Sequence, residues 1–101
     1  MKIFKTIDDK FAEIGFVKMK EDKYGVSYTR YDEKYKFTQC LDILYKEHGP
    51  NLIQSYDSSL YDIKGIGNTC VGLTMYETQL CIKKMKQWMK KYNIEDSKEI
   101  Y

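Results

Sequence analysis

Apolar residues recur at steps of three and four at the start of the chain, a spacing that places them on one side of a helix. Gly15 follows the last of them, and a residue without Cβ readily takes the left-handed conformation that ends a helix. We therefore predict an amphipathic helix over residues 2–14. Its apolar stripe comprises Ile3, Phe4, Ile7, Phe11 and Ile14.

A second pattern begins at Phe16, where apolar and polar residues alternate and Tyr, Val, Thr and Phe are frequent. Alternation with a period of two is typical of strands that bury one face. We predict strands over residues 16–20, 24–31 and 34–46. After the breaker Gly49-Pro50, a fourth and shorter strand is expected over residues 52–56.

Turn positions set the register that we expect between the first three strands. A turn at Asp22-Lys23 pairs Val17 with Tyr28, and a turn at 32–33 pairs Tyr28 with Phe37. Both registers collect apolar side chains on one face of the sheet. The predicted core face comprises Val17, Met19, Tyr24, Val26, Tyr28, Phe37, Leu41 and Ile43, and the opposite face Lys18, Lys20, Ser27, Thr29, Lys36 and Thr38.

Helical periodicity returns near the end of the chain and predicts a helix over residues 75–92. Thr74 and Glu77 fit a capping box, in which both side chains bond free backbone N–H groups at the helix start. Residues 93–101 lack this periodicity and are expected to fray. A fifth edge strand at residues 60–63 is left open. The apolar face of the helix carries Cys81, Ile82, Met85, Trp88, Met89 and Tyr92.

The order of these segments predicts one α+β domain spanning residues 1–101, ordered over about residues 2–92. It has an N-terminal helix, a four-stranded antiparallel meander and a C-terminal helix, with both helices on one face of the sheet. Composition agrees with this plan, since the 101 residues are 43% hydrophobic and 32% charged with a single Pro. Such a chain is neither disordered nor collagen-like.

Cysteine usage and hydropathy indicate a cytoplasmic protein. Three cysteines without CxxC spacing suggest neither a disulfide framework nor a zinc site. No run of about 18–20 uncharged apolar residues provides a membrane span, and Asp8 and Asp9 follow the first apolar residues too closely for a signal peptide. We expect no metal, no cofactor and no membrane association.

The sequence contains no recognisable catalytic motif. His48 is the only histidine, and nothing in the pattern brings a cysteine or serine nucleophile to it. The segment Gly65-Ile66-Gly67 lacks the lysine and the third glycine of phosphate-binding loops. We therefore expect a non-enzymatic protein, with a thiol- or histidine-dependent enzyme as the lowest-ranked hypothesis.

Positive charge concentrates on the predicted C-terminal helix. The chain has a net charge of +2, yet residues 78–92 contain five lysines and no acidic residue. All five are expected in water, opposite Met85 and Trp88, where the helix dipole and solvation explain them. Binding to the phosphates of a nucleic acid is the alternative, although the chain has only one arginine, Arg30. These lysines are Lys83, Lys84, Lys86, Lys90 and Lys91.

Ten tyrosines are the other unusual feature of the composition. Most suit the core or its margin, but Tyr31 alternates onto the outer face, and Tyr56 and Tyr61 lie at the expected sheet edge and loop. Because tyrosine is a common anchor of protein interfaces, we predict partner binding at these three residues. The partner is another protein, or a second copy in a homodimer paired through the sheet edge.

Several blocks of the sequence resemble small proteins of unknown function encoded by phages and prophages of low-GC Gram-positive bacteria. The resemblance spans about residues 4–92 and rests on core and capping patterns, so it concerns the fold more than a chemistry. It implies a small intracellular accessory protein that binds a partner rather than a catalyst, and it transfers no functional residue. The blocks are Gly15-Phe16-Val17, Tyr24-Gly25-Val26-Ser27-Tyr28, Ile53-Gln54-Ser55-Tyr56, Val71-Gly72-Leu73-Thr74-Met75-Tyr76-Glu77 and Ile82-Lys83-Lys84-Met85-Lys86.

Overall fold

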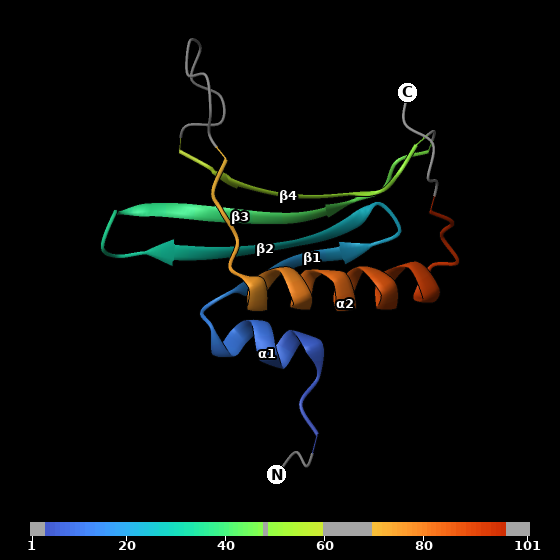
Figure 1. Cartoon of the computed structure of the whole chain (residues 1–101), viewed down its shortest axis with the longest axis horizontal. Helices are drawn as coiled ribbons and strands as arrows, with labels where there is room; N and C mark the ends of the chain where they lie inside the picture. Colours follow the sequence, from blue (N-terminus) through green and yellow to red (C-terminus); the bar gives the residue numbers. More distant parts are fainter. Residues whose placement is uncertain (1–3, 48, 60–69, 97–101) are drawn as a thin grey trace.

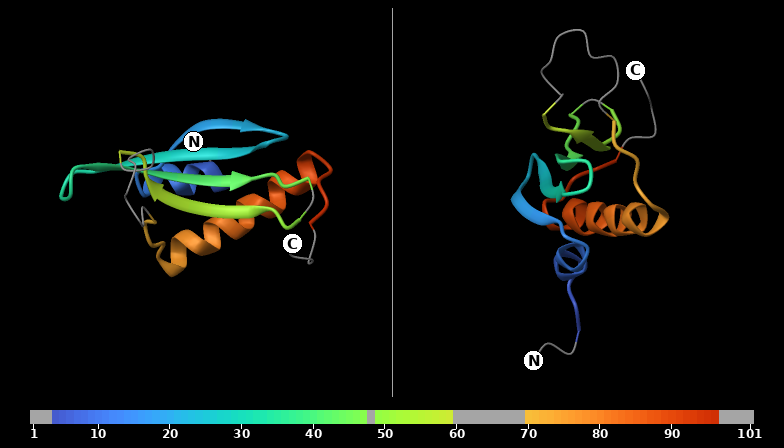
Figure 2. Two further views of the ribbon diagram at one scale, coloured as in Figure 1. Left: turned by 90° about the horizontal axis from the view of Figure 1, so that it is seen from above. Right: turned by 90° about the vertical axis from the view of Figure 1, so that its left-hand side faces the viewer.

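Two helices cover one face of a four-stranded antiparallel sheet, which confirms the predicted α+β architecture (Figures 1 and 2). The computed structural model describes residues 4–47, 49–59 and 70–96. The strands follow chain order across the sheet, β1-β2-β3-β4. The elements are α1 (Ile7–Glu13), β1 (Val17–Asp22), β2 (Gly25–Asp32), β3 (Phe37–Leu44), β4 (Leu52–Asp57) and α2 (Met75–Lys91).

Helix α1 begins at Ile7, five residues later than predicted, because Thr6 caps it. The Thr6 hydroxyl accepts from the Asp9 N–H at 3.0 Å, and the Asp9 carboxylate accepts from the Thr6 N–H at 3.0 Å. This capping box satisfies two backbone donors that a longer helix would have bonded internally. The helix ends at Glu13, one residue before the predicted end, and Gly15 follows with a φ of +94°.

The predicted register of the first hairpin is wrong by one residue before Met19 and by two residues after it. Val17 lies opposite Thr29, Lys18 lies opposite Tyr28, and the register shifts at Met19. A slip of one residue exchanges the two faces of a strand. The face of β1 that was expected in the core is therefore exposed, and Lys18 and Glu21 face the helices instead.

The second hairpin differs from the prediction by an even number of residues. Tyr28 lies opposite Leu41, and a longer turn over residues 33–36 connects the strands. Because an even shift preserves which side chains share a face, the predicted core residues of β2 and β3 are buried beneath the helices. They are Val26, Tyr28, Leu41 and Ile43, whereas Phe37 is half-buried and Tyr24 is exposed.

Helix α2 begins at Met75 with the predicted capping box of Thr74 and Glu77. Its Trp88 is fully buried, and the indole N–H donates to the Asp22 carbonyl oxygen at 2.8 Å. Ile94 packs against the same core and its N–H bonds the Met89 carbonyl at 2.8 Å. Residues 93–96, the part of the tail that is described, thus contact the rest of the domain, and the fraying expected for residues 93–101 stays a prediction.

Gly25 provides a test of how closely β2 and β3 approach. Its φ is +152°, and an added Cβ would lie 2.3 Å from the carbonyl oxygen of Ile43. Because this oxygen belongs to the backbone of β3, we expect Gly25→Ala to lower the free energy of unfolding by about 2–3 kcal/mol in urea denaturation. Gly72→Ala is the control, since its Cβ would meet nothing within 4 Å. Equal losses in the two variants would contradict the prediction.

Candidate interaction surface

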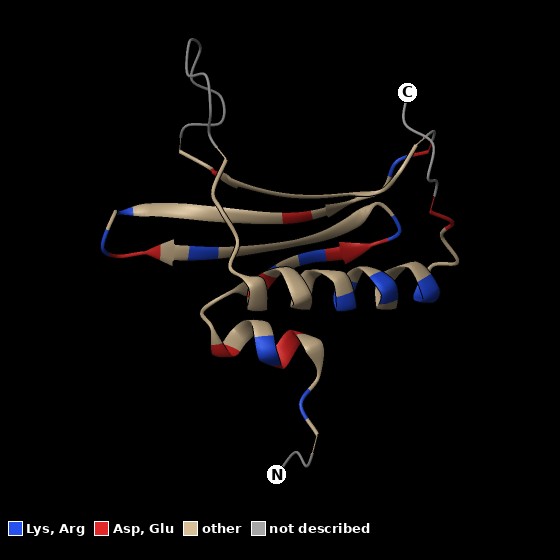
Figure 3. Ribbon diagram, in the orientation of Figure 1, with Lys and Arg blue, Asp and Glu red and all other residues tan. Residues whose placement is uncertain are grey.

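The face of the sheet that turns away from the helices lies toward the viewer in the left view of Figure 2. On β2–β4 it presents ten side chains, which we call the open face. Only one of the ten, Asp42, is charged, although 32% of the chain is charged. Figure 3 shows how little charge β3 and β4 carry. The open face comprises Ser27, Thr29, Tyr31, Thr38, Cys40, Asp42, Leu44, Leu52, Gln54 and Tyr56.

Asp42 is at the centre of a hydrogen-bonded cluster on the open face. Although neither described helix covers Asp42, this residue is only 8% exposed. Oδ1 accepts from Ser27 Oγ at 2.9 Å, and Oδ2 accepts from Gln54 Nε2 at 3.2 Å and Tyr56 OH at 3.0 Å. Burial, followed by this hydrogen bond to Asp42, raises the pKa of the Tyr56 phenol above its ordinary value. Three strands are thus joined side chain to side chain.

The tyrosines predicted to bind a partner fall into three situations. Tyr31 is 56% exposed on the open face, and Tyr56 is half-buried on the same face with its hydroxyl bonded to Asp42. Tyr61 and the possible strand at residues 60–63 lie outside the described residues. The role of Asp42 was missed by sequence reasoning, because an acidic residue between Leu41 and Ile43 has the ordinary pattern of a solvated outer face.

The two edges of the sheet are less suited to pairing with another strand. Along β4, Tyr56 pairs with Cys70, and the Val71 N–H bonds the Ser55 carbonyl at 3.0 Å. Along β1, the register shift at Met19 and two neighbouring lysines are features that oppose edge-to-edge association. Among the described residues, the open face is therefore better suited than either edge to contact another protein.

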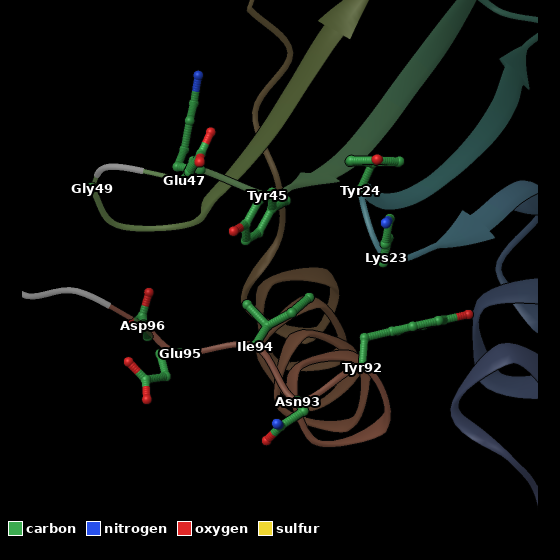
Figure 4. A pocket seen from close by; sticks show the side chains of 11 residues that line it. Lys23, Tyr24, Tyr45, Glu47, Gly49, Tyr92, Asn93, Ile94, Glu95 and Asp96 are labelled. Carbon is green, nitrogen blue, oxygen red and sulfur yellow. The ribbon is translucent and has the colours of Figure 1, made fainter.

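A hollow of about 790 Å³ opens at one end of the sheet, and the sequence pattern did not indicate it (Figure 4). Tyr45 and Ile94 point toward each other across it from the end of β3 and the segment after α2. The Asp96 carboxylate on its wall accepts from the Asn51 N–H at 3.2 Å. Both lysines and carboxylates line this hollow, so its charge does not select one class of ligand.

Lys84 corrects the expectation that all five lysines of the last helix point into water. It is 2% exposed, and its Nζ lies 2.7 Å from Glu21 Oε1 and 3.2 Å from Asp8 Oδ1. Lys18 Nζ contacts the same two carboxylates at 2.9 Å (Asp8) and 3.2 Å (Glu21), and Lys91 Nζ lies 3.3 Å from Glu21 Oε2. We call these five residues the ionic cluster, which joins α1, β1 and α2.

Contacts within the ionic cluster shift the pKa values of Asp8, Glu21 and Lys18. Burial alone would raise the pKa of Asp8, but hydrogen bonds from Tyr28 and Lys18 and the charge of Lys84 outweigh it and lower that pKa. Burial would also raise the pKa of Glu21, but hydrogen bonds from Lys84 and Lys18 outweigh this effect and lower that pKa. The bond to Asp8 raises the pKa of Lys18.

The other three lysines of α2 keep the arrangement that the sequence predicted. Lys83, Lys86 and Lys90 are exposed, and within the described part of the chain no carboxylate forms an ion pair with them. Their spacing of three and four residues places them on one side of α2.

No arrangement for metal-dependent chemistry is found in residues 4–47, 49–59 and 70–96, where no group of three or more His, Cys, Asp or Glu could hold an ion. His48 and residues 65–67 lie outside these ranges. Cys81 is buried, and burial, followed by the charge of Glu77, raises the pKa of its thiol to about 11. This side chain is therefore a core residue rather than a nucleophile.

Neither helix, within the described residues, is long and apolar enough to cross a membrane.

Comparison with known proteins returns no relative. No protein-family model matches the sequence, and neither a curated protein nor a solved structure matches it.

The ionic cluster predicts that substituting Lys84 lowers the stability of the fold, whereas substituting the neighbouring Lys83 does not. Lys84→Met removes the buried cation shared by Asp8 and Glu21, so the free energy of unfolding at pH 7 should fall by about 2–4 kcal/mol in urea denaturation. Lys83→Met removes the same charge from an exposed site and should change it by less than about 0.5 kcal/mol. Similar losses for both would rule out a structural role for the cluster.

Acid should weaken the same cluster. Because the folded-state pKa values of Asp8 and Glu21 are lowered, the two carboxylates stabilise the fold above their unfolded pKa of about 4. That contribution is lost as the pH falls from about 5 toward 2. Urea denaturation of the wild-type chain across this range should show the loss, and Lys84→Met should show a shallower slope. Parallel slopes would contradict the assignment.

Proposed function

We propose that this chain is a small non-enzymatic interaction module that binds a protein partner through its open face. One observation carries the proposal, namely the near absence of charge on β2–β4 of a sheet face that no described helix covers, in a chain that is 32% charged; on the same side of the sheet, charge is found at Lys20 and Asp22 of the edge strand β1. Charged residues are depleted at the centres of protein interfaces, where aromatic residues are enriched. A face that met only water would have no reason to exclude them.

The details of the open face support binding. Tyr31 and Leu52 are exposed at 56% and 42%, and they stand on β2 and β4, on either side of β3. Buried aromatic anchors supply much of the binding energy of an interface. The bonds of Ser27, Gln54 and Tyr56 to Asp42 hold those side chains in place before a partner arrives, which lowers the entropic cost of association.

A different protein suits the open face better than a second copy of the chain. A two-fold arrangement centred on this face would bring two Asp42 carboxylates toward each other, and like charges repel in a desolvated interface. The homodimer expected from the sequence remains an outcome of the test. An intracellular accessory role in a bacterial host is part of the proposal and rests on the sequence resemblance alone.

The proposal is tested by placing charge on the open face. The partner is isolated from a lysate of a low-GC Gram-positive bacterium and purified. The double variant Tyr31→Lys, Leu52→Lys should bind it at least about tenfold more weakly than the wild-type chain in calorimetry. Met75→Lys with Tyr76→Lys is the control, because it adds equal charge at exposed apolar residues of α2. Equal binding by the two double variants would contradict the proposal, and light scattering of the chain alone would reveal self-association.

Nucleic-acid binding through α2 is the second candidate function. It is favoured by the exposure of Lys83, Lys86 and Lys90 on one side of the helix, where no carboxylate of the described residues forms an ion pair with them. It requires that the affinity for a labelled oligonucleotide falls steeply between about 50 and 200 mM salt. Lys83→Glu with Lys90→Glu should then weaken fluorescence-anisotropy binding by about tenfold or more and reduce the salt slope. Lys34→Glu with Lys46→Glu reverses two exposed lysines elsewhere as the control. An unchanged affinity would remove this alternative.

A further inference from the structure

Resting on the proposed function, we propose that the partner places one cationic side chain, a guanidinium or ammonium group, against Asp42 at the centre of the open face. Asp42 is 8% exposed and receives its hydrogen bonds from a hydroxyl, an amide and a phenol, all of them neutral. Within the described residues, no lysine or arginine forms an ion pair with it.

Other carboxylates that the fold removes from water are given a cation. Glu77 is 6% exposed, and its Oε2 lies 2.7 Å from the Arg30 guanidinium. Glu21 and Asp8 share Lys84 in the ionic cluster. Asp42 and Glu77 are the two buried carboxylates of the described residues, and among those residues a cation pairs with Glu77 but none with Asp42. This difference indicates that its counter-charge comes from outside.

The position of Asp42 explains why a partner would supply that charge. Its carboxylate faces the side of the sheet away from both described helices, so a partner that docks there removes the water that still screens it. An uncharged surface there would leave a desolvated anion without compensation, which is strongly unfavourable. A guanidinium or ammonium group instead gains a charge-assisted hydrogen bond.

The geometry leaves room for such a bond. A carboxylate has about four acceptor positions, and within the described residues three are used, two of them on Oδ2 and one on Oδ1. Oδ1 is therefore the atom that the incoming donor would reach. The remainder of the open face is uncharged, so the partner surface that fits it carries one basic residue within apolar and hydroxyl-bearing neighbours.

The experiment uses displayed random peptides as the probe, selected on the full-length chain and then synthesised. Selected peptides should contain an Arg or Lys, and replacing that residue by norleucine should weaken binding to the wild-type chain by at least about tenfold. Asp42→Asn keeps the shape of the side chain and removes its charge, and it should weaken the basic peptides by a similar factor. Glu33→Gln removes an exposed charge from the β2–β3 turn and should leave binding unchanged.

The outcomes separate this inference from the proposed function. One outcome is that the peptides bind the Tyr31→Lys, Leu52→Lys variant more weakly but keep their affinity when norleucine replaces the basic residue or when Asp42 is changed to Asn. This outcome would contradict a cation at Asp42 and would still support the open face as the binding surface. Peptides that are insensitive to the double variant, or a selection that yields none, would overturn both. The norleucine comparison uses the wild-type chain, so its result does not depend on the folding of Asp42→Asn.

Discussion

The ammonium group of Lys84 is the point at which α1, β1 and α2 meet. It lies between the carboxylates of Glu21 and Asp8, at 2.7 and 3.2 Å, in a site that is almost closed to water. Breaking a buried ion pair is costly because the remaining charges are left without solvent or partner. The three elements are therefore held together on one side of the sheet, and the arrangement of everything else follows from that placement.

The two faces of the sheet treat charge in opposite ways. On the helix side, charged groups are buried in pairs, as in the ionic cluster and in the contact between Arg30 and Glu77. On the open face, charge is nearly absent, and the one carboxylate present is bonded to neutral groups. The described residues thus supply cations to the buried carboxylates on the helix side but not to Asp42 on the open face. This difference in charge compensation is the physical basis of the proposed interaction.

The period of the hydrophobic pattern sufficed to predict the element order, the bounds of β4 to within one residue, the start of α2 and the burial of Leu41 and Ile43. The register of β1 was not predictable in this way, because a one-residue change of turn exchanges its faces. Nor was the burial of Lys84, since Asp8 lies 76 positions away in the chain. An outer face with Ser27, Thr29 and Thr38 was predicted from the sequence, but the pattern did not indicate that Asp42 would be buried there among side chains of three strands.

Trp88 has a practical consequence, because it is the single tryptophan of the chain and is completely buried. Its indole is anchored to the Asp22 carbonyl at the end of β1, on the helix side of the sheet. Intrinsic emission excited at the red edge of the protein spectrum therefore arises from one site that senses whether α2 is docked. A molecule that settles on the opposite side of the sheet would leave this emission unchanged, so folding and association can be followed as separate optical signals in one sample.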